Sequence, residues 1–288
     1  MSDKTQPFPW MPILFLTALF YLNFTSRVIL APLLPVIEKD LGIGHGEAGS
    51  FFLYIACGSG VGLVGSGFVS SWLTHRNTLS LSIIMVGIVF SAISGSGSLA
   101  LMRGELVLAG IFAGFYMPSA IATLTGVTGQ ENWGRALAIH ELGPNLGFIT
   151  VPLLAEALLS FFSWRESIAL VGVACVLMGF LFLIFGRGGK HKGDPPRFQS
   201  MSKIVKSPSY WVMISLFVVS IGSSVGLYSM IPLFLVNEMG MDRPWANSLI
   251  GFSRVFGIVV LFLSGWITSR FGPKNSMTFF LLTTGIFT

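Results

Sequence analysis

Long runs of apolar residues, separated by short polar loops, make up most of the chain. Eight runs hold 20 or more residues, enough for each to cross about 30 Å of hydrocarbon as an α-helix. They lie at roughly 8–37, 47–73, 78–99, 105–128, 135–161, 165–186, 209–236 and 244–268. A ninth run begins near Ser276 and reaches Thr288 after about 13 residues, too few to span. The pattern predicts an all-α integral membrane protein with eight complete spans and part of a ninth.

The composition supports lipid as the solvent of these runs. Hydrophobic residues make up 53% of the chain and charged residues 10%, whereas a soluble domain is about 25% charged. Cys57 and Cys175 both lie in apolar runs and offer neither a disulfide nor a metal pattern. No His-x-x-x-His pair, acid cluster or nucleophile with a base falls at one depth, so the sequence predicts neither an enzyme nor a bound cofactor.

The loop charges predict the orientation of the chain. With a cytoplasmic N-terminus, eleven loop Lys and Arg residues fall on the cytoplasmic side of the membrane, and four fall on the outer side, namely Lys39, Arg103, Arg165 and Arg243. This distribution follows the positive-inside rule. We therefore read the net charge of +5 as a topology signal and not as a nucleic-acid surface. The expected location is the bacterial inner membrane, with the N-terminus and the central linker in the cytoplasm.

An internal repeat divides the chain. The stretch GFVSSWLTHRNTLSL at 67–81 aligns without gaps with GWITSRFGPKNSMTF at 265–279, which is an offset of six predicted helices. The only long polar segment lies between the two copies. We expect a six-helix N-terminal half at 1–186, a basic cytoplasmic linker at 187–208 that acts as a hinge, and an incomplete second half at 209–288. Two parallel repeats related by a pseudo-two-fold axis are typical of one large class of transporters.

The repeated loop resembles the signature loop of the major facilitator superfamily (MFS). The second copy matches that signature at Gly265, Arg270, Gly272 and Lys274, and the first copy keeps Gly67 and Arg76. The resemblance implies that these residues form a cytoplasmic gate. Both copies have Ser where the signature has an acid, so the gate would work without that charge. A complete member has twelve helices, and we therefore expect this chain to be truncated at its C-terminus.

A second motif lies in IHELGPNLG at 139–147. Its GPNLG resembles the Gly-Pro-x-x-Gly signature of antiporter members, although the flanking glycines are replaced by Ile139 and Phe148. Gly143 and Gly147 provide a small-residue face for close helix packing. Pro144 removes a helix hydrogen bond. We expect the three residues to let the helix pack closely and bend during the transport cycle.

Two arginines lie near the middle of the bilayer. Arg27 is 11 residues before Glu38, and Arg254 is 10 residues after Pro244, so each is roughly 15 Å deep. A charge there costs about 2.5–3.5 kcal/mol even on lenient scales and needs a partner or a function. The resemblance supports a function for Arg27. Anion-transporting members often carry an Arg in the first helix, at the same distance before a Pro as Arg27 lies before Pro35.

We expect the two arginines to bind an anionic substrate. Asn23 lies on the helix face of Arg27, and Asn247 on that of Arg254. Tyr228 joins them as a cavity residue, because SIGSSVGLY at 220–228 predicts a weak point in its helix. The structural alternative is that each arginine pairs with Glu141 or Glu156, or with backbone carbonyls.

The polar face of the fifth span suggests a proton site. Glu141, Asn145, Pro152 and Glu156 fall within about 60° on one side of that helix. A carboxylate in a low dielectric binds and releases protons near neutral pH, so we expect Glu141, together with His140, to couple transport to protons. The alternative is a satisfied polar pair near the cytoplasmic surface.

The sequence therefore predicts a secondary active transporter that alternates access to a small organic anion and couples it to H⁺. The expected partners are this substrate, the coupling proton and the lipid bilayer, and the expected state is a monomer. One alternative is an antiporter that exports drugs or lipophilic compounds, which the Gly-Pro motif favours and the unpaired arginines disfavour. Another is a membrane sensor that does not transport.

Overall fold

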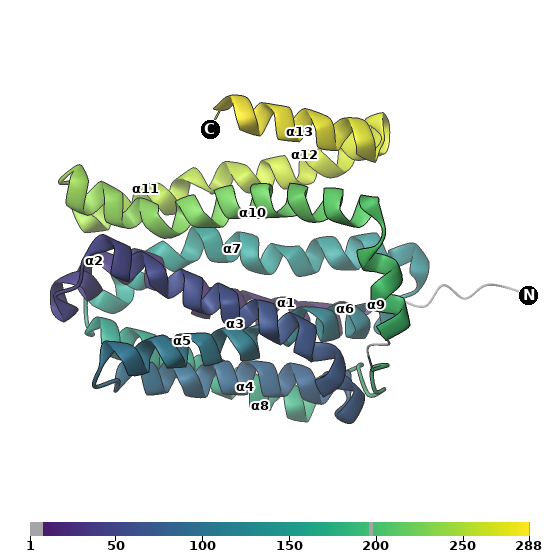
Figure 1. The fold of residues 1–288 in the computed structure, drawn as a ribbon, viewed down its shortest axis with the longest axis horizontal. Coiled ribbons are helices and arrows are strands. Elements are labelled where there is room, and N and C mark those ends of the chain that lie inside the picture. Colours follow the sequence, from purple (N-terminus) through teal and green to yellow (C-terminus); the bar gives the residue numbers. More distant parts are fainter. Residues whose placement is uncertain (1–7, 196–197, 288) are drawn as a thin grey trace, which may run out of the picture.

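A computed structural model describes residues 8–195 and 198–287, and within these ranges the chain is helical apart from one isolated β-bridge (Figure 1). Among the described residues, seven helical stretches are long and apolar enough to cross a membrane. The α-helices are α1 (Trp10–Val28), α2 (Leu30–Leu41), α3 (His45–Trp72), α4 (His75–Ser94), α5 (Leu99–Gly114), α6 (Tyr116–Val127), α7 (Trp133–Leu159), α8 (Trp164–Phe185), α9 (Phe198–Val205), α10 (Pro208–Leu233), α11 (Arg243–Ser253), α12 (Val255–Phe271) and α13 (Pro273–Phe287). A 3₁₀ turn, η1 (Gln130–Asn132), precedes α7, and a π turn, η2 (Phe234–Glu238), follows α10.

Local sequence signals set several helix ends. Ser163 and Glu166 form a reciprocal capping box at the start of α8, which satisfies backbone N–H groups that the first turn leaves unpaired. At the starts of α4 and α5, the hydroxyls of Thr74 and Ser98 accept from the backbone N–H groups of Asn77 and Leu101. Gly42 ends α2 with φ of 62°, a left-handed conformation that favours glycine. These caps keep the loops between the long helices short.

Three predicted spans are each two helices. The first span breaks at Ile29 into α1 and α2, and the fourth breaks at Phe115 into α5 and α6. Pro32 and Pro118 explain these breaks, because a proline has no N–H for the carbonyl four residues earlier, and that residue is the last one of α1 or α5. The eighth predicted span, 244–268, breaks at Arg254 into α11 and α12.

The expected weak point at 220–228 is wrong, because α10 is continuous from Pro208 to Leu233. The irregular turn of this span lies instead at η2, after Pro232. The ninth run forms α13, which has 15 residues.

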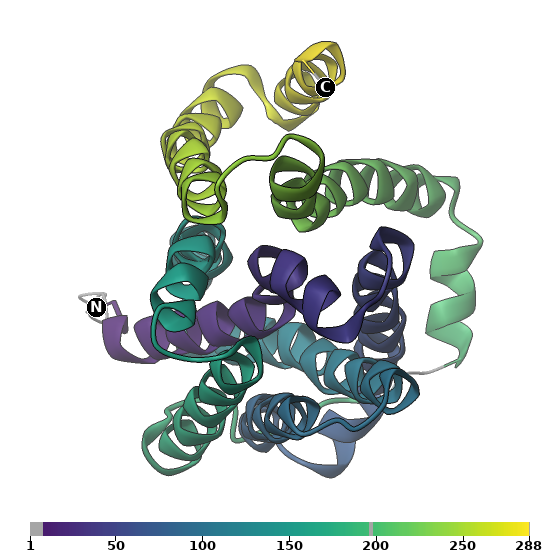
Figure 2. The same ribbon diagram turned by 90° about the vertical axis from the view of Figure 1, so that its left-hand side faces the viewer.

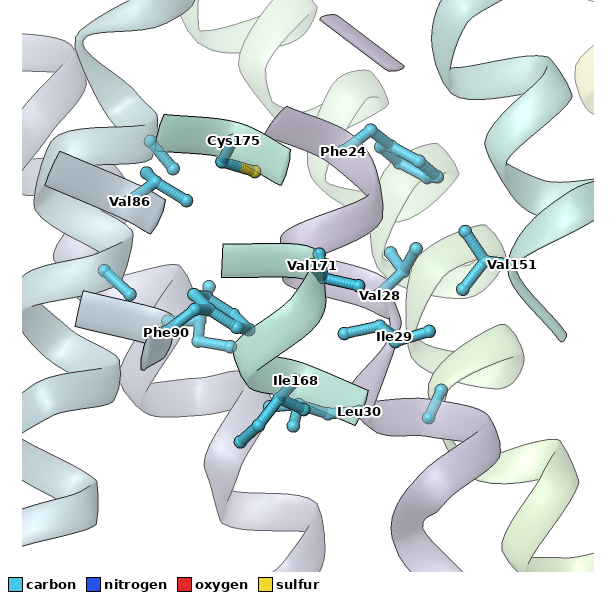
Figure 3. Packing of buried hydrophobic residues seen from close by; sticks show 14 of the residues in the cluster. Phe24, Val28, Ile29, Leu30, Val86, Phe90, Val151, Ile168, Val171 and Cys175 are labelled. Carbon is cyan, nitrogen blue, oxygen red and sulfur yellow. The ribbon is translucent and has the colours of Figure 1, made fainter. Parts of the chain in front are cut away.

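The apolar core lies where α1 and α2 meet α4, α7 and α8 (Figure 3). Val171 of α8 lies between Phe90 of α4 and Ile29, while the ring of Phe24 points away from Phe90. All four belong to the same cluster of buried hydrophobic residues. The core therefore holds the broken first span in place, with Arg27 two residues before the break.

The long helices lie side by side, and α10–α13 lie along one side of the others (Figures 1 and 2). We call α1–α8 the first segment and α10–α13 the second segment. The segments meet where α11 packs on α7 and α10 packs on α2. The chain begins at one end of the bundle, the N-terminal end, while α2 ends and α11 begins at the opposite end.

Candidate functional site

Three aromatic rings from three helices form a continuous group between the segments, which we call the aromatic cluster (Phe24, Phe148 and Tyr228). The ring centroids of Phe24 of α1 and Phe148 of α7 lie 4.7 Å apart. Those of Phe148 and Tyr228 of α10 are also 4.7 Å apart. Both pairs are T-shaped, an arrangement that aromatic quadrupoles favour. The cluster therefore connects the first segment to the second.

Both predicted arginines lie against this aromatic cluster. The guanidinium carbon of Arg27 is 5.9 Å from the ring centre of Phe24. That of Arg254 is 5.1 Å from Phe148 and 5.3 Å from Tyr228. These distances allow cation–π attraction. Each arginine also lies beside a helix break, so a substrate there would meet irregular backbone, as in many transporters.

Neither arginine has a carboxylate partner within the described ranges. The Nε–H of Arg27 donates to the carbonyl of Asn23 at 3.3 Å, so the predicted backbone alternative holds for that nitrogen. The side chain of Arg254 has no hydrogen bond or ion pair there beyond its ring contacts. The alternative of pairing with Glu156 is wrong, because Glu156 binds Arg243.

Pro152 leaves a backbone carbonyl of α7 free to accept a hydrogen bond from the aromatic cluster. Proline has no N–H, so Pro152 leaves the carbonyl of Phe148 without its partner inside α7. The hydroxyl of Tyr228 donates to that carbonyl at 3.3 Å. A proline of the first segment thus creates an acceptor that a residue of the second segment uses.

The small-residue face of α7 packs against α1, as predicted. A Cβ at Gly143 would lie 2.8 Å from the carbonyl oxygen of Thr17, and one at Gly147 would lie 2.6 Å from the ring of Phe24. Such distances leave no room for a side chain. Pro144 is buried on the same helix. The close packing is confirmed, while the part of these residues in bending stays a prediction.

The opposite face of α7 turns toward the second segment. At about 100° per residue, Phe148 shares a face with Glu141, Asn145 and Glu156, and both Phe148 and Glu156 contact the second segment. The amide of Asn145 donates to the backbone carbonyl of Glu141 at 2.7 Å. The carboxylate of Glu141 forms no hydrogen bond or ion pair with any described residue, and the side chain is partly buried.

His140 lies on the α1 side of α7, away from Glu141. Its ring stacks on Phe20 with centroids 4.5 Å apart, and its Nε2 is 3.0 Å from the hydroxyl of Tyr116. That hydroxyl is also 2.7 Å from the carbonyl of Leu16, which can only accept, so we infer that His140 Nε2–H donates to Tyr116. The other nitrogen, Nδ1, is buried and has no partner among the described residues. The sequence thus placed the two residues together, and the structure separates their side chains.

The side chains of Asn23 and Asn247 are buried and form hydrogen bonds with groups other than the two arginines. The amide of Asn23 donates to the carbonyl of Ala113 in α5 at 3.4 Å. The amide of Asn247 donates to Glu156 at 2.6 Å and to the carbonyl of Pro32 at 3.4 Å. Their part in binding substrate stays a prediction.

Charged and polar contacts join the segments at the end opposite the N-terminal end. Arg243 of α11 approaches Glu156 of α7 with Nε 2.9 Å from Oε1 and Nη2 3.2 Å from Oε2. On the other side of the interface, Asn237 of η2 donates to Glu38 of α2 at 2.8 Å. Together with Asn247 these residues form what we call the latch (Glu38, Glu156, Asn237, Arg243 and Asn247). In both parts a carboxylate of the first segment accepts from the second.

The signature-loop residues lie where α3 ends and α4 begins, and where α12 ends and α13 begins, at the N-terminal end of the bundle. Arg76 donates from Nη2 to the carbonyls of Leu183 at 2.7 Å and Ile184 at 3.1 Å, which are acceptors at the C-terminal end of α8. Gly272 has φ of 78° between α12 and α13. The others lie in or beside the same helices at Gly67, Gly265, Arg270 and Lys274, with the surroundings of Gly265 outside the described side chains. A gating role for these residues stays a prediction.

Sequence reasoning missed the aromatic cluster and most of the latch. Phe24 and Phe148 occur among 26 phenylalanines, and their contacts come from helices far apart in the chain. Arg243 was assigned to an outer loop. One available signal was the spacing of Phe24 and Arg27, which places them on adjacent turns of one helix.

Residues 13–288 match the sequence model of a protein family that is described as "Major Facilitator Superfamily". The "Probable hexose phosphate transport protein" of Chlamydia pneumoniae is 19% identical over 91% of this chain and 64% of its own length. The "Chloramphenicol resistance protein" of Streptomyces lividans is 25% identical over 54% of this chain and 40% of its own. The chain thus spans less than two thirds of either relative.

Among solved structures, the inward-facing, unoccupied crystal structure of a bacterial homologue of the human lysosomal transporter Spinster superimposes with a TM-score of 0.75. It is 18% identical, and the match covers 93% of this chain and 64% of that one. This likeness shows the fold.

Proposed function

Because the chain belongs to the Major Facilitator Superfamily, we propose that it acts in secondary active transport of a small organic anion by alternating access. The observation that carries the proposal is the pair of arginines on one aromatic cluster. Arg27 comes from the first segment and Arg254 from the second, and no described carboxylate neutralises either charge.

The geometry suits a small anion. The guanidinium carbon of each arginine lies over an aromatic ring, and the N–H groups other than Arg27 Nε–H can donate to a carboxylate or phosphate. In a low dielectric these bonds are stronger than in water. An anion held by both arginines would draw the segments together around it. The hexose phosphate relative is named for an anionic cargo, which supports this substrate class.

The latch supports a stage of the transport cycle in which the site is closed at the latch end and open at the other end. It joins the segments at the end opposite the N-terminal end, so we place the opening to the site at the N-terminal end. The loop charges place that end in the cytoplasm of a bacterial inner membrane. The central linker lies on the same side.

Proton coupling is assigned to Glu141. Its carboxylate has no described partner, and its helix face looks toward the second segment. A proton on this carboxylate removes a negative charge from the path that the anion follows. His140 contributes less directly in this scheme, because its ring faces Phe20 and Tyr116.

Ligand-induced thermal stabilisation of the purified chain tests the arginine site. Small carboxylates and organic phosphates are compared with lipophilic cations, using Arg27→Gln, Arg254→Gln and the control Arg103→Gln. Arg103 pairs with the exposed Glu47 at the end of the bundle opposite the N-terminal end. A ligand at 100 times its Kd adds about 2.7 kcal/mol. Stabilisation by an anion that both site variants lose and the control keeps is expected.

A second candidate is the export of lipophilic compounds, which the GPNLG motif and the chloramphenicol-resistance relative favour. Stabilisation by lipophilic compounds that Arg27→Gln and Arg254→Gln leave unchanged would overturn the anion proposal and select this one. Anion binding without flux in proteoliposomes would select the sensor instead.

A further inference from the structure

Residues 186–207 join the two segments, and we call them the connector. Its first part is bound to the first segment and is not a free hinge. Residues 186–193, the strap, fold back onto the loop between α3 and α4. The amide of Arg76 donates to the carbonyl of Gly189 at 2.8 Å, and that of His75 donates to His191 at 3.1 Å. Gly193 in turn donates to the carbonyl of Ser70 at 2.9 Å. These backbone bonds hold the strap against the first segment.

The strap presents its charges outward. Arg187, Lys190 and Lys192 are exposed, whereas Gly189 is buried with φ of 62°. This left-handed turn lets the backbone pass close to the loop below while the basic side chains point away. The apolar side chain of Ile184, near the end of α8, is exposed and lies shortly before the strap. The cations therefore lie next to a surface suited to lipid tails.

The second part of the connector, α9, runs crosswise to the long helices at the N-terminal end (Figures 1 and 2). A helix in this direction lies parallel to a membrane that the long helices cross. Its described side chains include exposed Lys203, Ile204 and Val205, and exposed Lys206 follows directly after its last residue. At about 100° per residue, Lys203 and Lys206 fall within one arc of about 60°, and Ile204 and Val205 fall outside it.

Trp211 connects α9 to the second segment. Its indole N–H donates to the carbonyl of Val205 at 2.8 Å, and the ring is exposed. Tryptophan is enriched where a membrane meets water. An exposed tryptophan that is bonded to the end of α9 is therefore consistent with α9 at the membrane surface.

From these features we propose that α9 and the strap form a docking surface for anionic phospholipids. Residues 186–207 contain six Lys and Arg residues and a single acid, Asp194. Basic clusters directly next to a membrane span attract anionic headgroups, and an amphipathic helix inserts its apolar face between them. Charge and apolar exposure point to the same occupant, a lipid with a negative headgroup. The lipid would anchor the connector while the segments move.

The test measures the melting temperature of the full chain in an uncharged detergent during titration with phosphatidylglycerol or phosphatidylcholine. Phosphatidylglycerol is expected to stabilise at a lower concentration. Lys203→Gln/Lys206→Gln should raise the half-maximal phosphatidylglycerol concentration at least about tenfold, since each charge near an anionic surface is worth about fivefold. The matched control Lys39→Gln/Arg103→Gln removes the same charge at the end of the bundle opposite the N-terminal end and should titrate as the wild type.

Two further arms keep the outcome decisive. Lys190→Gln/Lys192→Gln tests the strap in the same manner, and the melting temperature without lipid shows whether each variant is folded. Soluble glycerol phosphate tests for a site that takes a free anion. Equal effects of the two lipids, a wild-type titration in both pair variants, or full stabilisation by glycerol phosphate alone would each overturn the proposal.

Discussion

The Glu156–Arg243 pair of the latch gives the sharpest prediction. Glu156→Gln keeps the shape of the side chain and removes its charge. A hydrogen bond to a charged group contributes about 1.5–3 kcal/mol when it is shielded from water. The two side chains are 15% and 32% exposed, so screening places the loss near about 2 kcal/mol. Because 1.4 kcal/mol is tenfold, the state open at the latch end should gain about 30-fold in population.

Cysteine alkylation measures this shift. Ser229 is 2% exposed, and it lies between Tyr228 and Met230, which both contact the first segment. Ser229→Cys is placed in a background with Cys57→Ser and Cys175→Ala. A membrane-impermeant maleimide is then added on the latch side. The reaction rate follows the open population, so Glu156→Gln should raise it about 30-fold.

The control and a double variant make the result interpretable. Glu166→Gln removes an acid whose carboxylate bonds Ser163 within the first segment, and it should leave the rate unchanged. Arg243→Gln should accelerate alkylation as Glu156→Gln does, and the double variant should add little to either. A rate within twofold of the control, or fully additive effects, would refute the assigned role of the pair.

Three further outcomes follow from local geometry. Tyr228→Phe removes the donor to the Phe148 carbonyl and should lower the stability measured by thermal unfolding by about 1 kcal/mol, and an unchanged melting temperature would contradict the bond. Gly143→Ala should destabilise by about 1–3 kcal/mol through overpacking, whereas Gly60→Ala, which has open space around it, should not. Arg76→Gln removes the donors to the end of α8 and should cost about 1–2 kcal/mol in the same assay, with an equal melting temperature counting against the cap.

Hydrophobic patterning was enough to predict the class of fold. The seven candidate spans fall on seven of the predicted apolar runs, and the match over 13–288 confirms the family that GPNLG and the signature loop indicated. The same match confirms the prediction of a transporter family over an enzyme. Patterning did not predict the breaks at Ile29 and Phe115, because a break inside an apolar run leaves hydropathy unchanged. The prolines at 32 and 118 were the available signal.

The candidate site was predictable in part. Arg27 and Arg254 were singled out because a charge at bilayer depth is costly. Tyr228 was singled out because of an expected weak point in its helix, which the structure does not show. All three lie at the aromatic cluster. The separation of His140 from Glu141 was not anticipated, although adjacent residues on a helix point about 100° apart. Contacts between segments, such as Glu156 with Arg243, depend on the tertiary packing. No single sequence reveals them.

The hydrogen bond between Tyr228 and the Phe148 carbonyl has a bearing on what the protein can carry. In a medium without water an unpaired carbonyl is costly, so separation of the segments at this point leaves an acceptor that water or another donor must satisfy. Under the proposed function, a cargo that brings its own hydroxyl or N–H would lower the barrier to opening, and a cargo without one would leave the barrier in place. Pro152 would then let the cargo act on the rate of opening as well as on the strength of binding.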